Sequence, residues 1–189
     1  MSNKTRNDYL QEYLRDGEKV LWHGWPEPCK FLEKTDKTRI IRNWIIECIV
    51  VGAFLAFYVS MAADLSVKFI IGTLVVLVII VCSPYMEWRK LANQEYWVTD
   101  QRVISGRGKS DFTGIDMNLV DAADVKMLAT GNGCVRLCRK IIDEGEKQLR
   151  WRSSSPIGGN TPGEVGMVFY NVAHAEEALD AVRSVNENL

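Results

Sequence analysis

Two long apolar runs in the first half of the chain constrain its fold more than any other feature. Residues 43–63 contain one charged side chain, Glu47, and residues 69–86 contain none. A helix needs about 20 residues, at about 1.5 Å each, to cross a hydrocarbon core of roughly 30 Å. The runs therefore predict a transmembrane helical hairpin over residues 43–88, with residues 64–68 as the external turn.

Basic side chains flank this hairpin at its two open ends, which predicts its orientation. Arg89 and Lys90 follow the second run, the turn contains Lys68 alone, and five basic residues lead into the first run: Lys30, Lys34, Lys37, Arg39 and Arg42. Lys and Arg next to a spanning helix resist translocation. We therefore expect a multi-pass protein of the cell inner membrane with both termini in the cytoplasm.

Small side chains recur at every fourth position of the first run: Cys48, Gly52, Ala56 and Ser60. This spacing places them on one helix face and allows another backbone to approach closely. The favoured interpretation is packing against the second span, and the alternative is contact with a second copy of the chain in a homo-oligomer. Glu47 lies near the basic end of the run, where it can reach the interface; a functional role of this intramembrane carboxylate is the alternative.

The leader, residues 1–42, begins with a short helical pattern and continues as an extended segment. The helical stripe is Tyr9, Leu10, Tyr13 and Leu14. Gly17 is placed to end the helix, and its exposed face is expected to carry Asp8, Glu12, Asp16 and Glu18. A helix this short is not stable alone, so we expect it to dock on the cytoplasmic domain.

The remaining residues, 89–189, follow a period of two that is typical of antiparallel strands. The predicted strands are residues 96–99, 102–105, 115–119, 125–129, 135–142, 148–152 and 165–170. A helix is predicted to start near Ala173, with an apolar stripe at Val172, Ala175, Ala178, Leu179, Val182 and Val185. About seven short strands followed by one amphipathic helix predict an α+β chain, in which the helix covers the open end of a small antiparallel barrel or sandwich.

The turn between the first two strands contains polar side chains suited to fixing it. Thr99 and Asp100 can hydrogen-bond to turn backbone groups, and Arg102 follows within reach of Asp100 or an edge carbonyl. This arrangement indicates a structural role for Thr99 and Arg102, with a ligand contact as the alternative.

Three features occur in a recognisable order along the chain. They are the leader Gly17-Glu18-Lys19-Val20-Leu21-Trp22-His23-Gly24-Trp25-Pro26, the two-span hairpin, and the pattern Tyr96-x-x-Thr99-Asp100-x-Arg102. In this order they resemble the membrane-anchored bacterial PH-domain family, formerly described as a domain of unknown function. The resemblance covers nearly the whole chain. It implies a PH-like domain on the cytoplasmic side, with Tyr96, Thr99 and Arg102 as its hairpin motif, and it implies no common activity.

Motifs for catalysis, cofactors or metals do not emerge from the sequence. Gly108-Lys109-Ser110 resembles the end of a phosphate-binding loop, but Val103 stands where the leading Gly belongs. Four potential metal ligands lack the spacing of a metal site: His23, His174, Cys134 and Cys138. We therefore expect a non-enzymatic protein without a cofactor or metal. A membrane enzyme of unknown chemistry is the alternative.

Basic residues on the later strands suggest possible partners. The group comprises Arg136, Arg139, Lys140, Lys147, Arg150 and Arg152, with Trp151 interpreted as a core residue between two outward arginines. Residues 87–189 contain thirteen Lys and Arg against fifteen Asp and Glu, which does not favour nucleic acid. The favoured function is a membrane-anchored scaffold for a protein or peptide partner. The candidate ligand- or partner-binding residues are Arg136, Arg139, Arg150, Trp151 and Arg152. Recognition of anionic lipid through the four arginines of this set is the alternative function.

Overall fold

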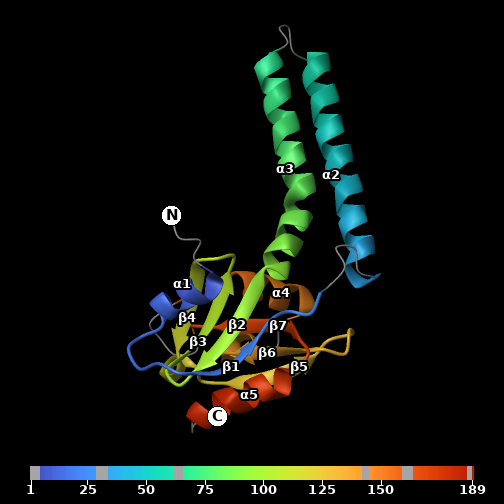
Figure 1. Cartoon of the computed structure of the whole chain (residues 1–189). Coiled ribbons are helices and arrows are strands. Elements are labelled where there is room, and N and C mark those ends of the chain that lie inside the picture. The colour runs from blue at the N-terminus through green and yellow to red at the C-terminus, as the bar shows by residue number, and fades with distance from the viewer. Residues whose placement is uncertain (1–4, 29–33, 62–65, 142–144, 159–163, 187–188) are drawn as a thin grey trace. The chain divides into compact units, whose positions relative to one another are not determined.

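The computed structural model describes residues 5–28, 34–61, 66–141, 145–158, 164–186 and 189. The chain forms two compact units (Figure 1). Cys29–Arg89 is one unit, which we call the hairpin unit, and Met1–Pro28 joins Lys90–Leu189 in the other, which we call the head. The leader therefore divides between the two units, because its first part belongs to the head.

The hairpin unit consists of two long helices, α2 (Lys34–Met61) and α3 (Val67–Ala92), the second of which continues into the first residues of the head. Ile41–Met61 and Val67–Ala92 are long and apolar enough to cross a membrane, with mean hydropathies of 2.0 and 2.5. Large apolar side chains along both helices are exposed, and such a surface is typical of contact with lipid or with other protein. Residues 64 and 65 of the predicted turn lie outside the described residues.

The small residues of α2 lie on the exposed side of that helix. Cys48, Gly52, Ala56 and Ser60 are all exposed, and no atom lies within 4 Å of a Cβ added at Gly52. Larger side chains of α2 are half-buried, among them Tyr58, whose ring centroid lies 4.4 Å from that of Phe69 on α3. The favoured interpretation, packing of the small face against the second span, is therefore wrong. Contact of this face with a second copy stays a prediction.

The head contains two antiparallel sheets. The four-stranded sheet has the order β1 (Val20–Gly24), β2 (Gln94–Thr99), β3 (Arg102–Arg107) and β4 (Asp111–Asp116). The three-stranded sheet has the order β5 (Ala123–Met127), β6 (Gly133–Leu137) and β7 (Met167–Val172). The expectation of an α+β chain with about seven short strands is confirmed.

Strands β1 and β2 are neighbours although α2 and α3 separate them in sequence. His23 faces Trp97 and Gly24 faces Tyr96 across this pair. The whole hairpin unit is therefore an insertion between two adjacent strands of one sheet. As a consequence, the segments before α2 and after α3 must lie on the same side of any membrane that both helices cross.

The core of the head lies between the sheets and is closed by α5 (Ala175–Val185). Tyr96 of β2 stacks on Phe169 of β7 with ring centroids 4.7 Å apart. Ala178, Leu179 and Val182 of α5 are buried in the same cluster, at the three- and four-residue spacing of one helix face. The predicted amphipathic C-terminal helix is thus confirmed.

Two further helices pack on the head. Leu10 of α1 (Arg6–Tyr13) is buried against Trp97 and Ile104, so the predicted docking of the N-terminal helix is confirmed. Leu149 of α4 (Glu146–Ser154) is buried in a separate cluster that includes Leu91.

Helix α4 corrects the predicted strand at residues 148–152. The alternation of polar and apolar residues in that segment indicated a period of two. The fully buried positions are instead Leu149 and Ser153, four residues apart as on a helix face. Two other predicted strands end earlier than expected because a 3₁₀ helix follows each: Met117–Leu119 after β4 and Arg139–Ile141 after β6. Strand β4 also begins at Asp111, before the predicted start at residue 115.

Gly133 on β6 tests the packing of α5 on the sheet. A Cβ there would lie 2.5 Å from the Cβ of Ala175 and 2.9 Å from Cγ1 of Val125. We expect Gly133→Ala to lower the free energy of unfolding by about 1–3 kcal/mol through overpacking, measured by urea unfolding of the full chain in detergent. Gly158→Ala is the control, because nothing lies within 4 Å of that position. Equal effects of the two substitutions would contradict this packing.

Candidate functional site

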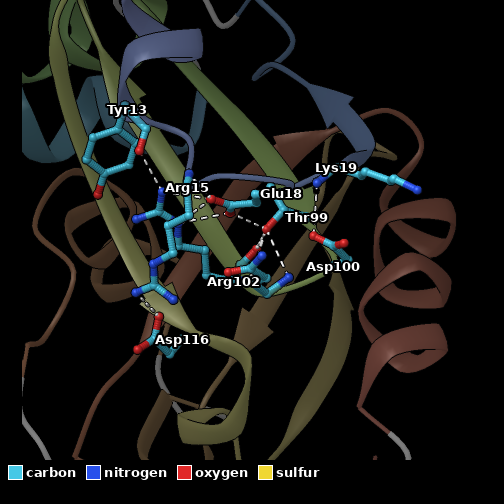
Figure 2. A network of polar contacts seen from close by, with 9 residues as sticks. Tyr13, Arg15, Glu18, Lys19, Thr99, Asp100, Arg102 and Asp116 are labelled. Atoms are coloured by element: carbon cyan, nitrogen blue, oxygen red, sulfur yellow. Dashed lines mark hydrogen bonds and ion pairs between the residues drawn. The ribbon is translucent and has the colours of Figure 1, made fainter.

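Glu18 lies at the centre of a buried polar network beside the β2–β3 turn (Figure 2). Its carboxylate accepts hydrogen bonds from Nε and Nη2 of Arg102, both at 2.9 Å, and from the Thr99 hydroxyl at 2.6 Å. The backbone N–H of Arg15 donates a fourth, at 2.8 Å. The side chain of Glu18 is 0% exposed and that of Arg102 is 9% exposed. Paired donors on one carboxylate are the strong form of an arginine contact.

This pair remains fully charged at neutral pH. Burial by itself would raise the pKa of Glu18, but hydrogen bonds from Arg102, Arg15 and Thr99 outweigh it and hold that pKa below its usual value. Burial by itself would lower the pKa of Arg102, but the contact with Glu18 raises it. Removal of either partner would therefore leave an uncompensated buried charge.

The network ties the leader to the β2–β3 hairpin. Nη2 of Arg102 also donates to the carbonyl oxygen of Tyr13 at 2.7 Å, and its guanidinium lies 4.5 Å from the centre of the Tyr13 ring. Asp100 accepts a hydrogen bond from the backbone N–H of Lys19 at 2.9 Å. Thr99 accepts hydrogen bonds from the backbone N–H groups of Gln101 and Arg102, as predicted for the turn. Arg102 pairs with Glu18 and not with Asp100, one of the two partners expected for it, because the leader brings a buried carboxylate to the turn.

The expected exposure of Glu18 is wrong, for a local reason. Gly17 has a φ of +78°, in the left-handed region that glycine adopts without a steric cost. The chain turns there, and Glu18 reaches the interior of the head instead of continuing the surface of α1. The one sequence feature that could have indicated a special role for Glu18 was the Gly17-Glu18 pair in the leader motif, which is part of the resemblance to the PH-domain family.

Tyr96 joins both sheets and α4. Its side chain is fully buried, and its hydroxyl contacts Oγ of Ser153 and accepts a hydrogen bond from the backbone N–H of Tyr170 at 3.2 Å. Gln94, near the start of β2, bonds Oγ of Ser105 at 2.8 Å and also contacts Ser153. Tyr96 therefore helps to fix α4 against the core.

The basic residues proposed as a lipid site do not form one strand surface. Arg136 on β6 is buried and pairs with Asp124 of β5. Arg139 is exposed in the following 3₁₀ helix, while Arg150, Trp151 and Arg152 lie on α4. The expectation that Trp151 belongs to the core is wrong, since its side chain is 47% exposed.

One groove on the head has a volume of about 560 Å³ and adjoins the β2–β3 turn. Arg15 and Asp116 both line it, and their side chains pair with each other at 2.7 Å. That pair neutralises its own charge, and Asp100, which bonds the backbone of Lys19, is the remaining charged side chain of the lining.

A second groove, of about 270 Å³, has a different character. It is lined by Trp22, His23, Gly24, Trp25, Glu27, Val172, Ala173, His174 and Glu177. Among the residues that the structure describes, the set contains two tryptophans, two histidines and two carboxylates, and neither Lys nor Arg. Both histidines of the chain therefore meet at one groove, although they belong to separate elements. We call this the tryptophan groove.

Asn171 at the end of β7 holds the two walls of the tryptophan groove together. The backbone N–H of Glu27 donates to the Asn171 carbonyl at 2.8 Å, and Nδ2 of Asn171 donates to the Glu27 carbonyl at 2.9 Å. Thr130 and Asn132 donate to Oδ1 of Asn171 at 3.0 and 3.1 Å. The segment after β1 is thereby fixed opposite the start of α5.

Aromatic stacking orients the side chains on the β1 wall. The His23 ring stacks on Trp97 at 5.2 Å between centroids and meets the edge of Trp25 at 5.7 Å. Nε2 of His23 lies 3.1 Å from the carboxylate of Glu95. Trp25 is 56% exposed, so its ring is available to an occupant of the groove.

The two described cysteines of the head do not indicate a reactive site. Cys134 and Cys138 are both buried, and burial raises the pKa of the Cys134 thiol to about 12. That thiol is therefore protonated and unreactive at neutral pH. Among the described residues, no group of three or more His, Cys, Asp or Glu side chains is arranged to hold a metal ion.

No protein-family model, curated protein sequence or solved structure matches this chain. The resemblance to the membrane-anchored PH-domain family therefore stays a prediction that rests on its motif residues. Of these, Glu18, Tyr96, Thr99 and Arg102 lie inside the head, and Trp22 and Trp25 line the tryptophan groove.

Loss of Arg102 tests the buried network. We expect Arg102→Met to lower the free energy of unfolding by about 3–5 kcal/mol, because Glu18 is left charged and buried. Arg15→Met is the control, since its ion pair with Asp116 is about half exposed and should contribute at most about 1 kcal/mol. Urea unfolding of the full chain in detergent measures both. Similar losses of unfolding free energy for the two variants would show that the buried pair stabilises the head no more than the exposed pair does.

The lowered pKa of Glu18 predicts a pH dependence of the same stability. The contribution of a carboxylate with a lowered native pKa is complete above its usual pKa, near 4.5, and is lost as pH falls toward the native value. We therefore expect wild type to exceed Glu18→Gln in free energy of unfolding most at pH 7, with the gap narrowing below pH 4.5. Urea unfolding between pH 7 and pH 3.5 measures the gap. A difference in free energy of unfolding between wild type and Glu18→Gln that widens as pH falls would refute the lowered pKa of Glu18.

Proposed function

We propose that this protein is a non-catalytic, membrane-anchored binding module whose PH-like head holds a protein or peptide partner on the cytoplasmic face of the bacterial inner membrane. The two candidate spans and the basic residues at their open ends support the anchor and its orientation. The pairing of β1 with β2 also favours an even number of crossings between them. Two antiparallel sheets closed by a C-terminal helix support the PH-like fold.

The tryptophan groove is the observation that carries the proposal. Its lining combines Trp22 and the exposed Trp25 with the carboxylates of Glu27 and Glu177, and no Lys or Arg of the described ranges lines it with them. Tryptophan faces attract cations, and carboxylates pair with them. The occupant that fits this chemistry is a Lys or Arg side chain of a peptide segment. An anionic lipid headgroup would be repelled by the same two carboxylates.

The size and surroundings of the groove favour a peptide over a small-molecule cofactor. About 270 Å³ is slightly below the range of roughly 300–1,000 Å³ that is usual for small-molecule sites. Val20 and Leu21 on the same edge strand are also exposed. An extended partner segment can therefore insert one cationic side chain into the groove and cover the apolar surface of Val20 and Leu21 beside it.

Site-specific photo-crosslinking in native membranes tests this function. With a photo-reactive phenylalanine analogue in place of Trp25, we expect adducts to a defined protein partner, and with the same analogue in place of Met127, which is equally exposed on β5, we expect none. A second-site Glu177→Lys change should reduce the Trp25 adducts at least tenfold, because it places a like charge against the partner's cation.

Glu176→Lys is the matched control for that charge reversal, because Glu176 is the exposed neighbour of Glu177 on α5 and does not line the groove. Its adduct yield should match that of the parent. The proposed function would be contradicted if the analogue at position 127 gave as many adducts as the analogue at position 25. It would also be contradicted if Glu177→Lys left the adduct yield at position 25 unchanged.

A further inference from the structure

Trp151 on α4 is an exposed aromatic side chain that neither the core nor the tryptophan groove uses. Its side chain is 47% exposed, and the guanidinium of Arg152 lies 4.6 Å from its ring centroid. Arg150 is half-buried on the same helix. Tryptophan with adjacent arginine is the combination that is favoured where protein meets lipid headgroups.

The opposite face of α4 is fixed to residues that follow directly on the second apolar run. Leu149 packs in one buried cluster with Leu91, and Ser153 contacts Gln94 and Tyr96. Leu91 comes five residues after the end of that run at residue 86, which is about 7.5 Å along a helix. The polar headgroup layer is itself roughly 5–8 Å thick on each side of the hydrocarbon core. Along the chain, the contact of α4 with the Leu91 cluster therefore lies within about one headgroup-layer thickness of the end of the apolar run.

The charge of α4 differs in sign from that of the head as a whole. Residues 146–154 contain Lys147, Arg150 and Arg152 against Glu146, whereas acidic residues outnumber basic ones over residues 87–189. A short basic helix with an exposed tryptophan suits the negative surface of a leaflet rich in anionic lipid.

We infer that α4 is a lipid-contacting helix that inserts Trp151 at the headgroup level and pairs Arg150 and Arg152 with anionic phospholipid headgroups. This inference rests on the membrane anchor of the proposed function and is independent of the tryptophan groove. It uses a face of the head that the groove residues do not share.

Fluorescence of the full chain in lipid nanodiscs tests this contact. The emission of wild type minus that of Trp151→Phe isolates Trp151, and wild type minus Trp25→Phe isolates Trp25 as the control. In nanodiscs of phosphatidylcholine with one third phosphatidylglycerol, bromine on the upper acyl chain should quench the Trp151 difference emission at least twofold. The Trp25 difference emission should change much less.

Charge variants separate headgroup pairing from simple proximity. We expect Arg152→Glu to reduce the quenching of Trp151 in the phosphatidylglycerol nanodiscs, and Arg152→Lys to preserve it. Arg183→Glu on α5, which is exposed and distant in sequence, is the matched control and should leave the quenching unchanged. Thermal melting verifies that each variant folds.

Three outcomes would overturn the inference. A chain that enters nanodiscs but shows no quenching of Trp151 refutes lipid contact by α4 and leaves the groove proposal intact. Quenching that is equal in pure phosphatidylcholine and unaffected by Arg152→Glu refutes the pairing with anionic headgroups. A chain that stays monomeric in buffer without lipid or detergent refutes the anchor, and with it both proposals.

Discussion

The buried ion pair between Glu18 and Arg102 connects two parts of the chain that the whole hairpin unit separates. A buried pair is costly to desolvate, so its main effect is to specify one arrangement over others. Here it specifies how the leader meets the β2–β3 hairpin, because Thr99 and Arg102 both bond to Glu18. A slip of β1 by one residue would expose its core-facing side chains and would also draw Glu18 away from its donors.

This connection explains why an insertion of two apolar helices is compatible with a well-formed head. Strand β1 pairs with β2, and Trp22 of β1 stacks on Phe169 of β7 at 5.8 Å. The first strand is thus part of the same core as the strands that follow the insertion. Its partners in the head are synthesised only after α2 and α3, so the head can be completed only once the whole insertion has been made.

Local signals in the sequence predicted the elements that depend on local physics. Length and apolarity predicted α2 and α3, alternation around a short turn predicted β2 and β3, and an amphipathic stripe predicted α5. The incorrect predictions concern segments whose structure depends on contacts with residues that are distant in sequence. Residues 148–152 alternate like a strand, but contacts of Leu149 with the Leu91 cluster and of Ser153 with Tyr96 favour a helix. Likewise, sequence spacing could not predict that His23 and His174 line one groove, because hydrogen bonds between Glu27 and Asn171 bring their two segments together.

The two surfaces proposed for partners differ in charge, and this difference assigns them different occupants. The tryptophan groove presents Glu27 and Glu177, whereas α4 presents Arg150 and Arg152. Screening limits such fields to about 8–10 Å at physiological salt, so each surface selects its occupant by contact and short-range charge. An anionic leaflet that attracts α4 also raises the local concentration of cationic peptide segments, which are the ligands suited to the groove. If α4 contacts the leaflet as we infer, that contact would favour the binding that we propose for the groove, and the two surfaces share no residue.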